Sequence, residues 1–262
     1  MKTLIFDIFG RMAHFRRFYS SVTSLSYYFP PRNTVIGLIA AILGYDRDSY
    51  YKILGRENLG IAVSINNRYG LRRLVMNTNY LDTDNISLKR FRGEGKKPTT
   101  IEYILPMPPE QEVSYRIYTI PLRQELNYII DELATRIERR KYVYPISLGP
   151  ANCLAYAELV SSSADIEILK IEDKVSLPLT TVVPYSIIPE DGLMFDTGKK
   201  IVLEDRLPPD FAEERKIDGG SSSRSYLFEM YGEAINLNLD SRASGNIFRT
   251  SIEGRDVYGA FM

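Results

Sequence analysis

The sequence of 262 residues has little of the chemistry that most enzymes use, since it contains one histidine, His14, and one cysteine, Cys153. One cysteine excludes an internal disulfide and is typical of a reducing cytosol. Its apolar neighbours Leu154 and Ala155 favour a buried, inert thiol. No G-x-S-x-G, Walker or C-x-x-C motif is present, and no histidine cluster suits a metal ion. We therefore expect no catalytic residue, no metal site and no cofactor.

The sequence also lacks a signal-peptide pattern and an apolar run long enough to cross a bilayer. These absences predict a cytoplasmic protein with no membrane partner. Net charge is zero, because 33 Lys and Arg balance 33 Asp and Glu. The balance hides a polarity, since residues 1–100 hold 16 basic and 7 acidic residues, and the net charge is +9 there and −9 in the remainder. A basic half favours a polyanionic partner, unless the charges do not segregate in space.

Hydrophobic patterning predicts an α+β fold. Four apolar runs are typical of strands: residues 2–9, 59–65, 113–120 and 153–160. Helical spacing occurs over 33–44, which Gly44 closes, and again from Pro121 to Ile137, where Leu122 opens the apolar face. A short helix is also expected over 47–54. The order strand, helix, strand, strand, helix, strand is that of a ferredoxin-like (RRM-like) βαββαβ domain, although the RNP1 motif of a standard RRM is absent.

A long insertion, residues 66–112, separates the second and third strands, where this kind of domain needs only a short turn. Basic residues dominate it: Arg68, Arg72, Arg73, Lys89, Arg90, Arg92, Lys96 and Lys97. Two interpretations stay open. The insertion is either disordered or a protruding arm that contacts nucleic acid or a neighbouring subunit and contributes little to the core.

From about residue 172 onward, prolines separate short runs that are typical of strands: residues 175–183, 200–203, 225–230 and 234–239. We therefore divide the chain into a ferredoxin-like domain of residues 1–171 and a small β-rich C-terminal region of residues 172–262.

The most informative stretch is Phe9–Gly44, where cationic and aromatic side chains alternate between the first strand and the first helix. Asn33 or Thr34 is the expected helix cap, so the first helical N–H groups, near Val35 and Ile36, would be unpaired and able to bind an anion. Arginine offers bidentate phosphate contacts, and flat rings stack on unpaired bases. The stretch predicts one phosphate-binding surface, formed by Arg11, Arg16, Arg17 and Arg32. An ordinary charged surface loop is the alternative.

Two motifs in this stretch, G-R-M-A-H-F-R and F-P-P-R-N-T-V-I-G-L-I-A-A-I-L-G, resemble the amino-terminal signature of the CRISPR-associated Cas5 family, which belongs to the RAMP superfamily. Residues 144–150, Y-P-I-S-L-G-P, are similar to a second family element. The resemblance implies a non-catalytic subunit of a type I, Cascade-like surveillance complex in antiviral defence. Such a subunit holds the repeat-derived 5′ tag of the guide CRISPR RNA, beside the Cas7 backbone subunit and the large subunit. It also implies that the insertion is a thumb-like hairpin.

The expected RNA-binding residues combine the stretch, the insertion and the second element. They are Arg11, His14, Phe15, Arg16, Arg17, Tyr28, Arg32, Asn33, Thr34, Arg72, Arg73, Lys89, Arg90, Arg92, Lys96, Lys97 and Gly149. For His14, a ring packed or hydrogen-bonded at the base of the loop is an equally good interpretation. For Gly149, a plain turn glycine is the alternative to close approach of RNA.

Two other functions stay open. One branch of the Cas5 family cleaves precursor CRISPR RNA without a metal, using a tyrosine and an adjacent Lys-His pair. Groups suited to acid–base catalysis are present here: His14, Tyr27, Tyr28, Arg16 and Lys141. The chain has no second histidine, however, and so lacks that pair. The other function is an assembly adaptor whose basic half binds an acidic partner protein.

Overall fold

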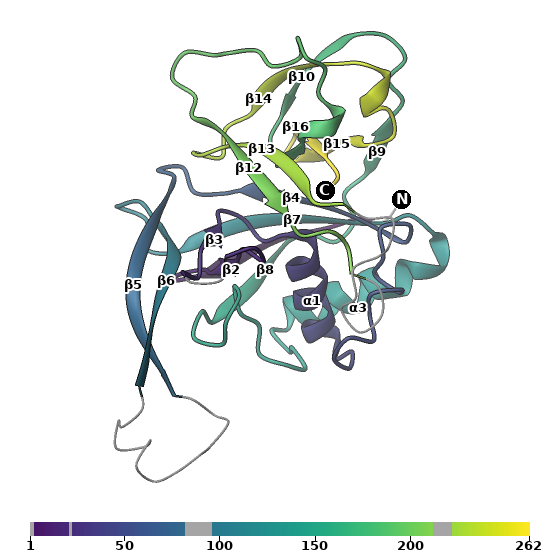
Figure 1. The fold of residues 1–262 in the computed structure, drawn as a ribbon. Helices are drawn as coiled ribbons and strands as arrows, with labels where there is room; N and C mark the ends of the chain where they lie inside the picture. Colours follow the sequence, from purple (N-terminus) through teal and green to yellow (C-terminus); the bar gives the residue numbers. More distant parts are fainter. Residues whose placement is uncertain (1–2, 21–22, 82–95, 212–221) are drawn as a thin grey trace.

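The computed structural model describes residues 3–20, 23–81, 96–211 and 222–262 (Figure 1). Over these residues the protein has two α-helices and several β-sheets, which confirms the α+β part of the predicted fold class. Neither of these helices is long and apolar enough to cross a membrane.

The first sheet contains the four strands that the sequence predicts, each within two residues of its expected limits. They are β1 (Leu4–Gly10), β4 (Leu59–Ile65), β7 (Val113–Pro121) and β8 (Ala155–Ser161). Their order is β4-β7-β1-β8, and every neighbouring pair is antiparallel. Strands β1, β4 and β7 are buried almost throughout, which explains why their sequences are nearly continuous apolar runs.

Both faces of this sheet are covered. The helices α1 (Arg32–Leu43) and α3 (Asn127–Glu138) lie together on one face (Figure 1). Alternate residues of β1 join the same core cluster as these helices: Leu4, Phe6 and Ile8. The intervening Ile5 faces the other way and packs in a second cluster with Phe248 from the C-terminal region.

Helix α1 begins earlier than expected and has no side-chain cap. Pro31 is the N-cap residue, and its carbonyl oxygen accepts the N–H groups of Thr34 and Val35 over 2.8 and 3.1 Å. The predicted cap by Asn33 or Thr34 and the unpaired N–H of Val35 are therefore wrong. The predicted helix end is confirmed, because Gly44 is the C-cap with a φ of 83°, in the left-handed region that glycine adopts easily.

Two other helix boundaries differ from expectation. Residues 47–54 form turns and no helix. Pro121 is the last residue of β7, a strand-end position where a missing N–H does little harm. A 3₁₀ turn, η2 (Gln124–Leu126), then leads into α3, whose apolar face is buried as predicted from Ile129 to Ile137, whereas Leu122 is exposed.

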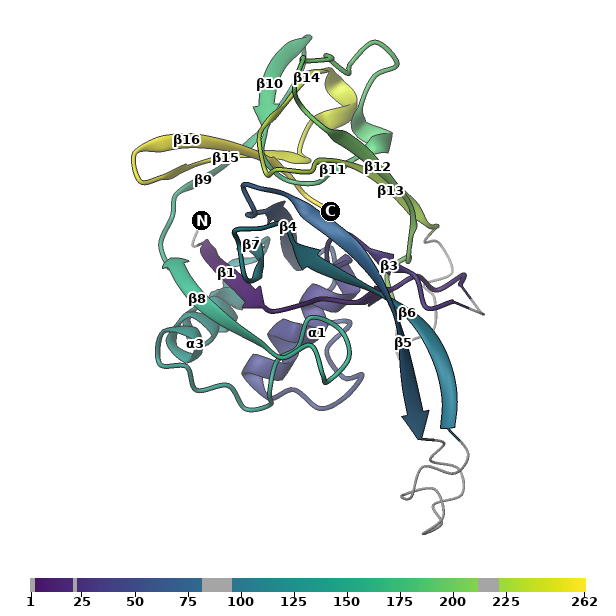
Figure 2. The same cartoon turned by 90° about the vertical axis from the view of Figure 1, so that its left-hand side faces the viewer.

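The insertion contains a long antiparallel hairpin, β5 (Leu71–Leu81) and β6 (Lys96–Pro106), which projects from the rest of the molecule (Figures 1 and 2). We call this hairpin the arm. Its base is part of the core, since Ile101, Tyr103 and Ile104 are at most 2% exposed. The expectation that the insertion contributes little to the core is therefore wrong for the base of β6.

Strands also dominate the C-terminal region. One sheet has the order β14-β10-β16-β15-β9 and another the order β11-β13-β12. The first sheet consists of β9 (Ile166–Leu169), β10 (Val175–Leu179), β14 (Ile235–Leu239), β15 (Ile247–Ile252) and β16 (Arg255–Ala260). The second consists of β11 (Val183–Pro184), β12 (Ile201–Leu207) and β13 (Arg224–Glu229). Short 3₁₀ turns are η3 (Tyr185–Ile187) and η5 (Ser241–Ala243).

The C-terminal strands share a core with the first part of the chain. Tyr226 and Phe228 of β13 belong to the same core cluster as α1, and both rings contact Phe29 edge-on. The division at residue 171 stays a prediction, but the basic and acidic halves of the chain do fold against each other.

The outer edge of β4 is also joined to the C-terminal region. The N–H of Val182 donates to the carbonyl oxygen of Val63 over 2.8 Å, and the N–H of Met262 donates to that of Ile61 over 2.9 Å. These two carbonyls lie two residues apart, so they point to the same side of the strand.

Candidate functional site

Residues 11–31 connect β1 to α1 and form the centre of the candidate site. The chain folds back on itself in a short ladder of β2 (Phe15–Arg16) and β3 (Ser26–Tyr27). Isolated bridges from Ala13 to Ile104 and from Ser24 to Ile101 fix this loop to β6 on both sides of the ladder. The loop and the arm are therefore one structural unit, and Figure 2 shows β3 beside the base of β6.

His14 is a buried ring that holds this unit together. Its Nδ1 donates to the carbonyl oxygen of Glu102 over 2.7 Å, and its Nε2 lies 3.0 Å from the Ser24 hydroxyl, which can donate to it. The ring is 6% exposed, and burial lowers its pKa, so the neutral form is favoured. Both ring nitrogens are engaged within the protein, which agrees with the interpretation of His14 as a hydrogen-bonded ring at the base of the loop.

Gly149 packs against the backbone of His14. Its φ is 110°, and a Cβ at this position would lie 2.0 Å from the carbonyl oxygen of His14. The neighbouring Leu148 carbonyl accepts the N–H of His14 over 2.9 Å. The close approach that requires glycine is thus an approach to the loop backbone, and this packing joins the two sequence elements of the family resemblance.

Two of the expected RNA-binding arginines, Arg17 and Arg73, bind carboxylates of the protein itself. The Arg17 guanidinium donates to Glu204 of β12, and the Arg73 Nη2 lies 3.1 Å from the other oxygen of the same carboxylate. The Arg73 Nε is also 3.5 Å from Glu102. We call Arg17, Arg73, Glu102 and Glu204 the arginine–glutamate cluster. It joins the loop, both strands of the arm and the C-terminal region.

Backbone groups and rings complete the surroundings of this cluster. Glu204 is 3% exposed, and it also accepts the N–H of Tyr28 over 3.1 Å. The Arg73 guanidinium carbon lies 4.1 Å from the centre of the Tyr28 ring, and that of Arg17 lies 5.3 Å from the centre of the Tyr27 ring, distances typical of cation–π contacts. Burial raises the pKa of Glu204, against the opposing effect of the two arginines.

Arg32 and Asn33 bind the protein itself. Arg32 is 5% exposed, and its Nη2 donates to the carbonyl oxygens of Leu54 and Leu59 over 3.0 and 2.7 Å. Burial lowers its pKa to about 10. The Asn33 amide donates to the Pro209 carbonyl over 2.7 Å. The start of α1 is therefore occupied by protein groups, and it is not the open anion site that the sequence suggested.

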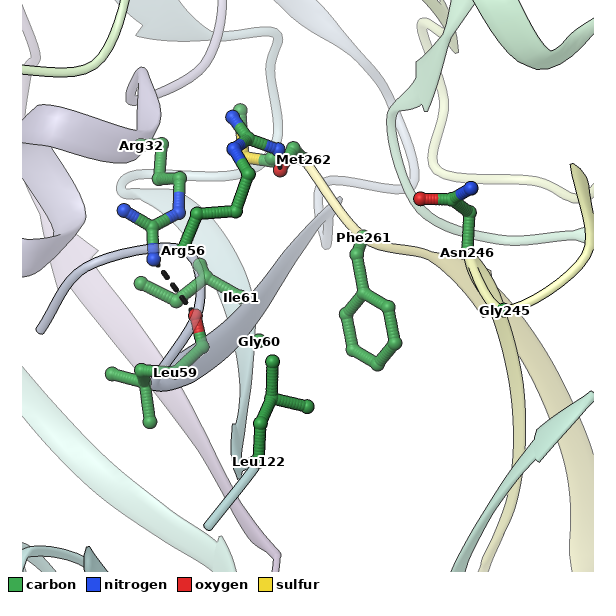
Figure 3. Close-up of a pocket in the computed structure, with 10 residues that line it drawn as sticks. All are labelled: Arg32, Arg56, Leu59, Gly60, Ile61, Leu122, Gly245, Asn246, Phe261 and Met262. Carbon is green, nitrogen blue, oxygen red and sulfur yellow. Dashed lines mark hydrogen bonds between the residues drawn. The ribbon is translucent and has the colours of Figure 1, made fainter. Parts of the chain in front are cut away.

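Figure 3 shows a cavity of about 120 Å³ beside Arg32. Arg32 and Arg56 lie on one side of it, and Phe261 and Asn246 on the other. The Arg56 Nε is paired with Asp210 over 2.8 Å, and the Arg32 guanidinium binds backbone carbonyls. Because these cations have partners in the protein, we assign no ligand to the cavity.

The expected site residues thus fall into three groups. The exposed side chains are Arg11, Arg16 and Arg72, the partly buried ones are Arg17, Arg73, Tyr28, Asn33 and Thr34, and the buried ones are His14, Phe15 and Arg32. Lys89, Arg90 and Arg92 lie outside the described residues, and Lys96 and Lys97 begin β6. The structure does not bring Arg11, Arg16, Arg17 and Arg32 together as one open surface.

Sequence reasoning missed the acidic members of the cluster. Glu102 lies in the basic insertion and Glu204 in a strand of the acidic half, and neither has a local pattern that marks it. Within the part of the chain that the structure describes, no group of three or more His, Cys, Asp or Glu side chains is arranged to hold a metal ion.

Comparison with known families identifies the class of protein. The family model described as CRISPR-associated protein (Cas5) matches residues 3–224, which include the loop, the arm and strand β12. The chain therefore belongs to the CRISPR-associated Cas5 family. No curated protein matches the sequence.

One solved structure supports the fold, and two others are similar at lower TM-scores. A CRISPR protein from Archaeoglobus fulgidus is 14% identical, with 99% of each chain covered and a TM-score of 0.55. A chain of a CRISPR RNA-guided surveillance complex is 12% identical, with 90% of this chain and 91% of that chain covered and a TM-score of 0.48. A further Cas protein is 14% identical, with 93% and 98% covered and a TM-score of 0.47. At 14% identity the likeness to the Archaeoglobus fulgidus protein concerns the fold alone.

Proposed function

We propose that this protein is a non-catalytic RNA-binding subunit of a type I CRISPR surveillance complex in antiviral defence. It holds the repeat-derived 5′ tag of the guide RNA, beside the Cas7 backbone subunit and the large subunit. The observation that carries the proposal is membership of the Cas5 family, based on a match over residues 3–224.

The topology supports a ferredoxin-like RAMP domain with a thumb. In chain order, the four strands of the first sheet follow the βαββαβ pattern, and the sheet order β4-β7-β1-β8 places the first and third strands at its centre. The arm is inserted between the second and third of these strands. Arg72 is exposed on β5, and the sequence adds five lysines and arginines between residues 89 and 97.

The surroundings of two of the candidate catalytic groups, His14 and Tyr27, support a non-catalytic role. A general base must reach the 2′-hydroxyl of RNA. His14 is buried with both ring nitrogens engaged, and the Tyr27 hydroxyl donates to the carbonyl oxygen of Arg206. Burial raises the pKa of Tyr27, which further disfavours its ionised form.

Incubation of the purified chain with repeat RNA in the presence of a chelator tests the proposal. We expect the RNA to bind, with an affinity that falls as salt rises, and to stay intact. Specific cleavage that disappears in Tyr28→Phe would instead support the ribonuclease. If the chain bound no RNA but joined the other subunits, it would be an assembly adaptor.

Shortening the arm should separate RNA binding from folding. Thr78 and Thr99 are paired across the hairpin, so Asn-Gly in place of residues 79–98 closes it with a two-residue turn. The buried base stays in place, so we expect a folded protein with a melting temperature close to wild type. The salt slope of RNA binding should fall by roughly 0.7 for each phosphate contact that is lost.

A companion variant keeps the arm at full length and replaces only its charges, with glutamine at Lys89, Arg90, Arg92, Lys96 and Lys97. It should also weaken RNA binding. Undiminished RNA binding and normal assembly of both variants would show that these charges are only a solvated face. An insoluble shortened chain would show that residues 79–98 are needed for folding.

A further inference from the structure

Strand β12 contains a β-bulge at the candidate site. Glu204 pairs with Tyr226 of β13, but the next pair is Leu207 with Arg224. Asp205 and Arg206 therefore both face the single residue between these partners, and Arg206 has a φ of 52°, in the left-handed region that arginine rarely adopts. Bulges redirect side chains and occur often at functional sites, and strained residues persist only where the surroundings hold them.

The bulge brings Arg206 to the tip of the loop. Its carbonyl oxygen accepts the Tyr27 hydroxyl, and its guanidinium carbon lies 4.6 Å from the centre of the Tyr19 ring. Arg17 also contacts this residue, since its Nη1 donates to the Tyr19 hydroxyl over 2.8 Å. Tyr19 is thus a fixed ring between two arginines, one from the loop and one from the C-terminal region.

The side chains next to Tyr19 are exposed to solvent. Phe18 meets Tyr19 edge-on, with ring centres 5.4 Å apart, and is 55% exposed. The Arg206 side chain is 61% exposed, and Arg16 is exposed as well. The carboxylate that accompanies Arg206 is Asp205, 3.3 Å away, and an ion pair exposed to this extent leaves the arginine available to a stronger anion.

We propose that Phe18 and Arg206 form a contact site for one nucleotide of single-stranded RNA, with the base stacked on Phe18 and its phosphate bound by Arg206. An exposed ring beside cations is the combination that single-stranded nucleic acid requires, because every base has a flat face and every linkage a negative charge. An acidic protein partner would account for the exposed Arg206 but not for the exposed ring of Phe18. This inference rests on the proposed function and adds a residue from the C-terminal region to the RNA surface.

The test uses the full chain and an RNA of about 10 nucleotides, within the site sizes of single-strand-binding proteins, that contains one 2-aminopurine. Stacking of the 2-aminopurine base on Phe18 should quench the fluorescence of that base. Phe18→Leu should abolish the quenching and weaken binding about 5- to 150-fold, as expected for one lost base stack. Arg206→Gln should lower the salt slope by roughly 0.7.

The controls are an exposed phenylalanine and an exposed arginine elsewhere in the C-terminal region. Phe195 is 88% exposed, and Arg249 is 45% exposed and paired with Asp256. Phe195→Leu and Arg249→Gln should leave both readouts unchanged. Melting temperatures show whether each variant is folded. Because Phe18 is exposed, Phe18→Leu should stay folded and test the site even if Arg206→Gln destabilises the bulge.

The possible failures are distinguishable. If the wild type binds RNA and the Phe18 and Arg206 variants behave like their controls, the nucleotide site is wrong and the proposed function stands. If those variants bind RNA normally but fail to join the other subunits, the surface contacts protein and the inference is also wrong. If the wild type binds no RNA, the proposed function fails, and this inference fails with it.

Discussion

A Gly149→Ala variant should lose about 2–5 kcal/mol of folding free energy, which corresponds to a fall in melting temperature of roughly 4–20 °C. Two effects add. A φ of 110° is unfavourable for alanine, and the new Cβ would lie 2.0 Å from the His14 carbonyl oxygen, so the backbone of one segment must move. Thermal unfolding followed by circular dichroism measures the change. RNA binding should weaken as well, because the displaced residue anchors the loop.

Gly198 is a matched control for this variant. Its φ is 103°, almost the same, but nothing lies within 4 Å of the position that a Cβ would take. Gly198→Ala therefore carries the backbone strain without the collision, and we expect it to cost only about 1–3 kcal/mol. Equal losses in the two variants would mean that the contact with His14 has no consequence for stability.

A Glu204→Ala variant should be destabilised by about 3–5 kcal/mol, since it leaves two arginines and a backbone N–H without their common acceptor. Glu204 is 3% exposed, whereas the side chains of Arg17 and Arg73 are 17% and 30% exposed. Partial access of water to the arginines places the effect toward the lower end of that range. Chemical denaturation at neutral pH gives the free energy of unfolding directly.

Glu167 provides the comparison for Glu204, because it is an exposed glutamate in strand β9. Glu167→Ala should change stability by less than about 0.5 kcal/mol. A Glu204→Ala protein as stable as this control would show that the arginine–glutamate cluster does not hold the loop to the C-terminal region. A loss of stability in Arg17→Ala alone would show that this arginine contributes to folding through its contact with Glu204.

The strands of the first sheet could be predicted because their signal is local. Runs such as residues 59–65 are apolar except for Ser64, and the structure covers both faces of the strands that they form. Gly44 was predictable for a similar reason, since few other residues adopt a φ of 83° at a helix end. The starts of the helices could not be predicted from the sequence. Asn33 is an excellent cap by type, but its amide binds the Pro209 carbonyl, a partner 176 residues away.

The candidate site could be located from the sequence but not constructed from it. The interleaved arginines and rings mark the loop that the arginine–glutamate cluster holds, yet the pattern does not say which arginines face solvent. Arg32 is enclosed by the carbonyls of Leu54 and Leu59, and Arg17 by Glu204. Such pairings depend on how distant segments meet. They also explain the charge polarity of the chain in part, because a glutamate of the acidic half neutralises arginines of the basic half.

The two hydrogen bonds along β4 bear on the solubility of the whole molecule. An open strand edge, with its row of bare carbonyl and N–H groups, is a template on which a second molecule can build. Val182 and Met262 occupy the carbonyls of Val63 and Ile61, so the C-terminal region blocks this edge of the first sheet. A chain that ended before residue 172 would keep every strand of that sheet but would expose the edge of β4. Edge-to-edge aggregation would then compete with folding.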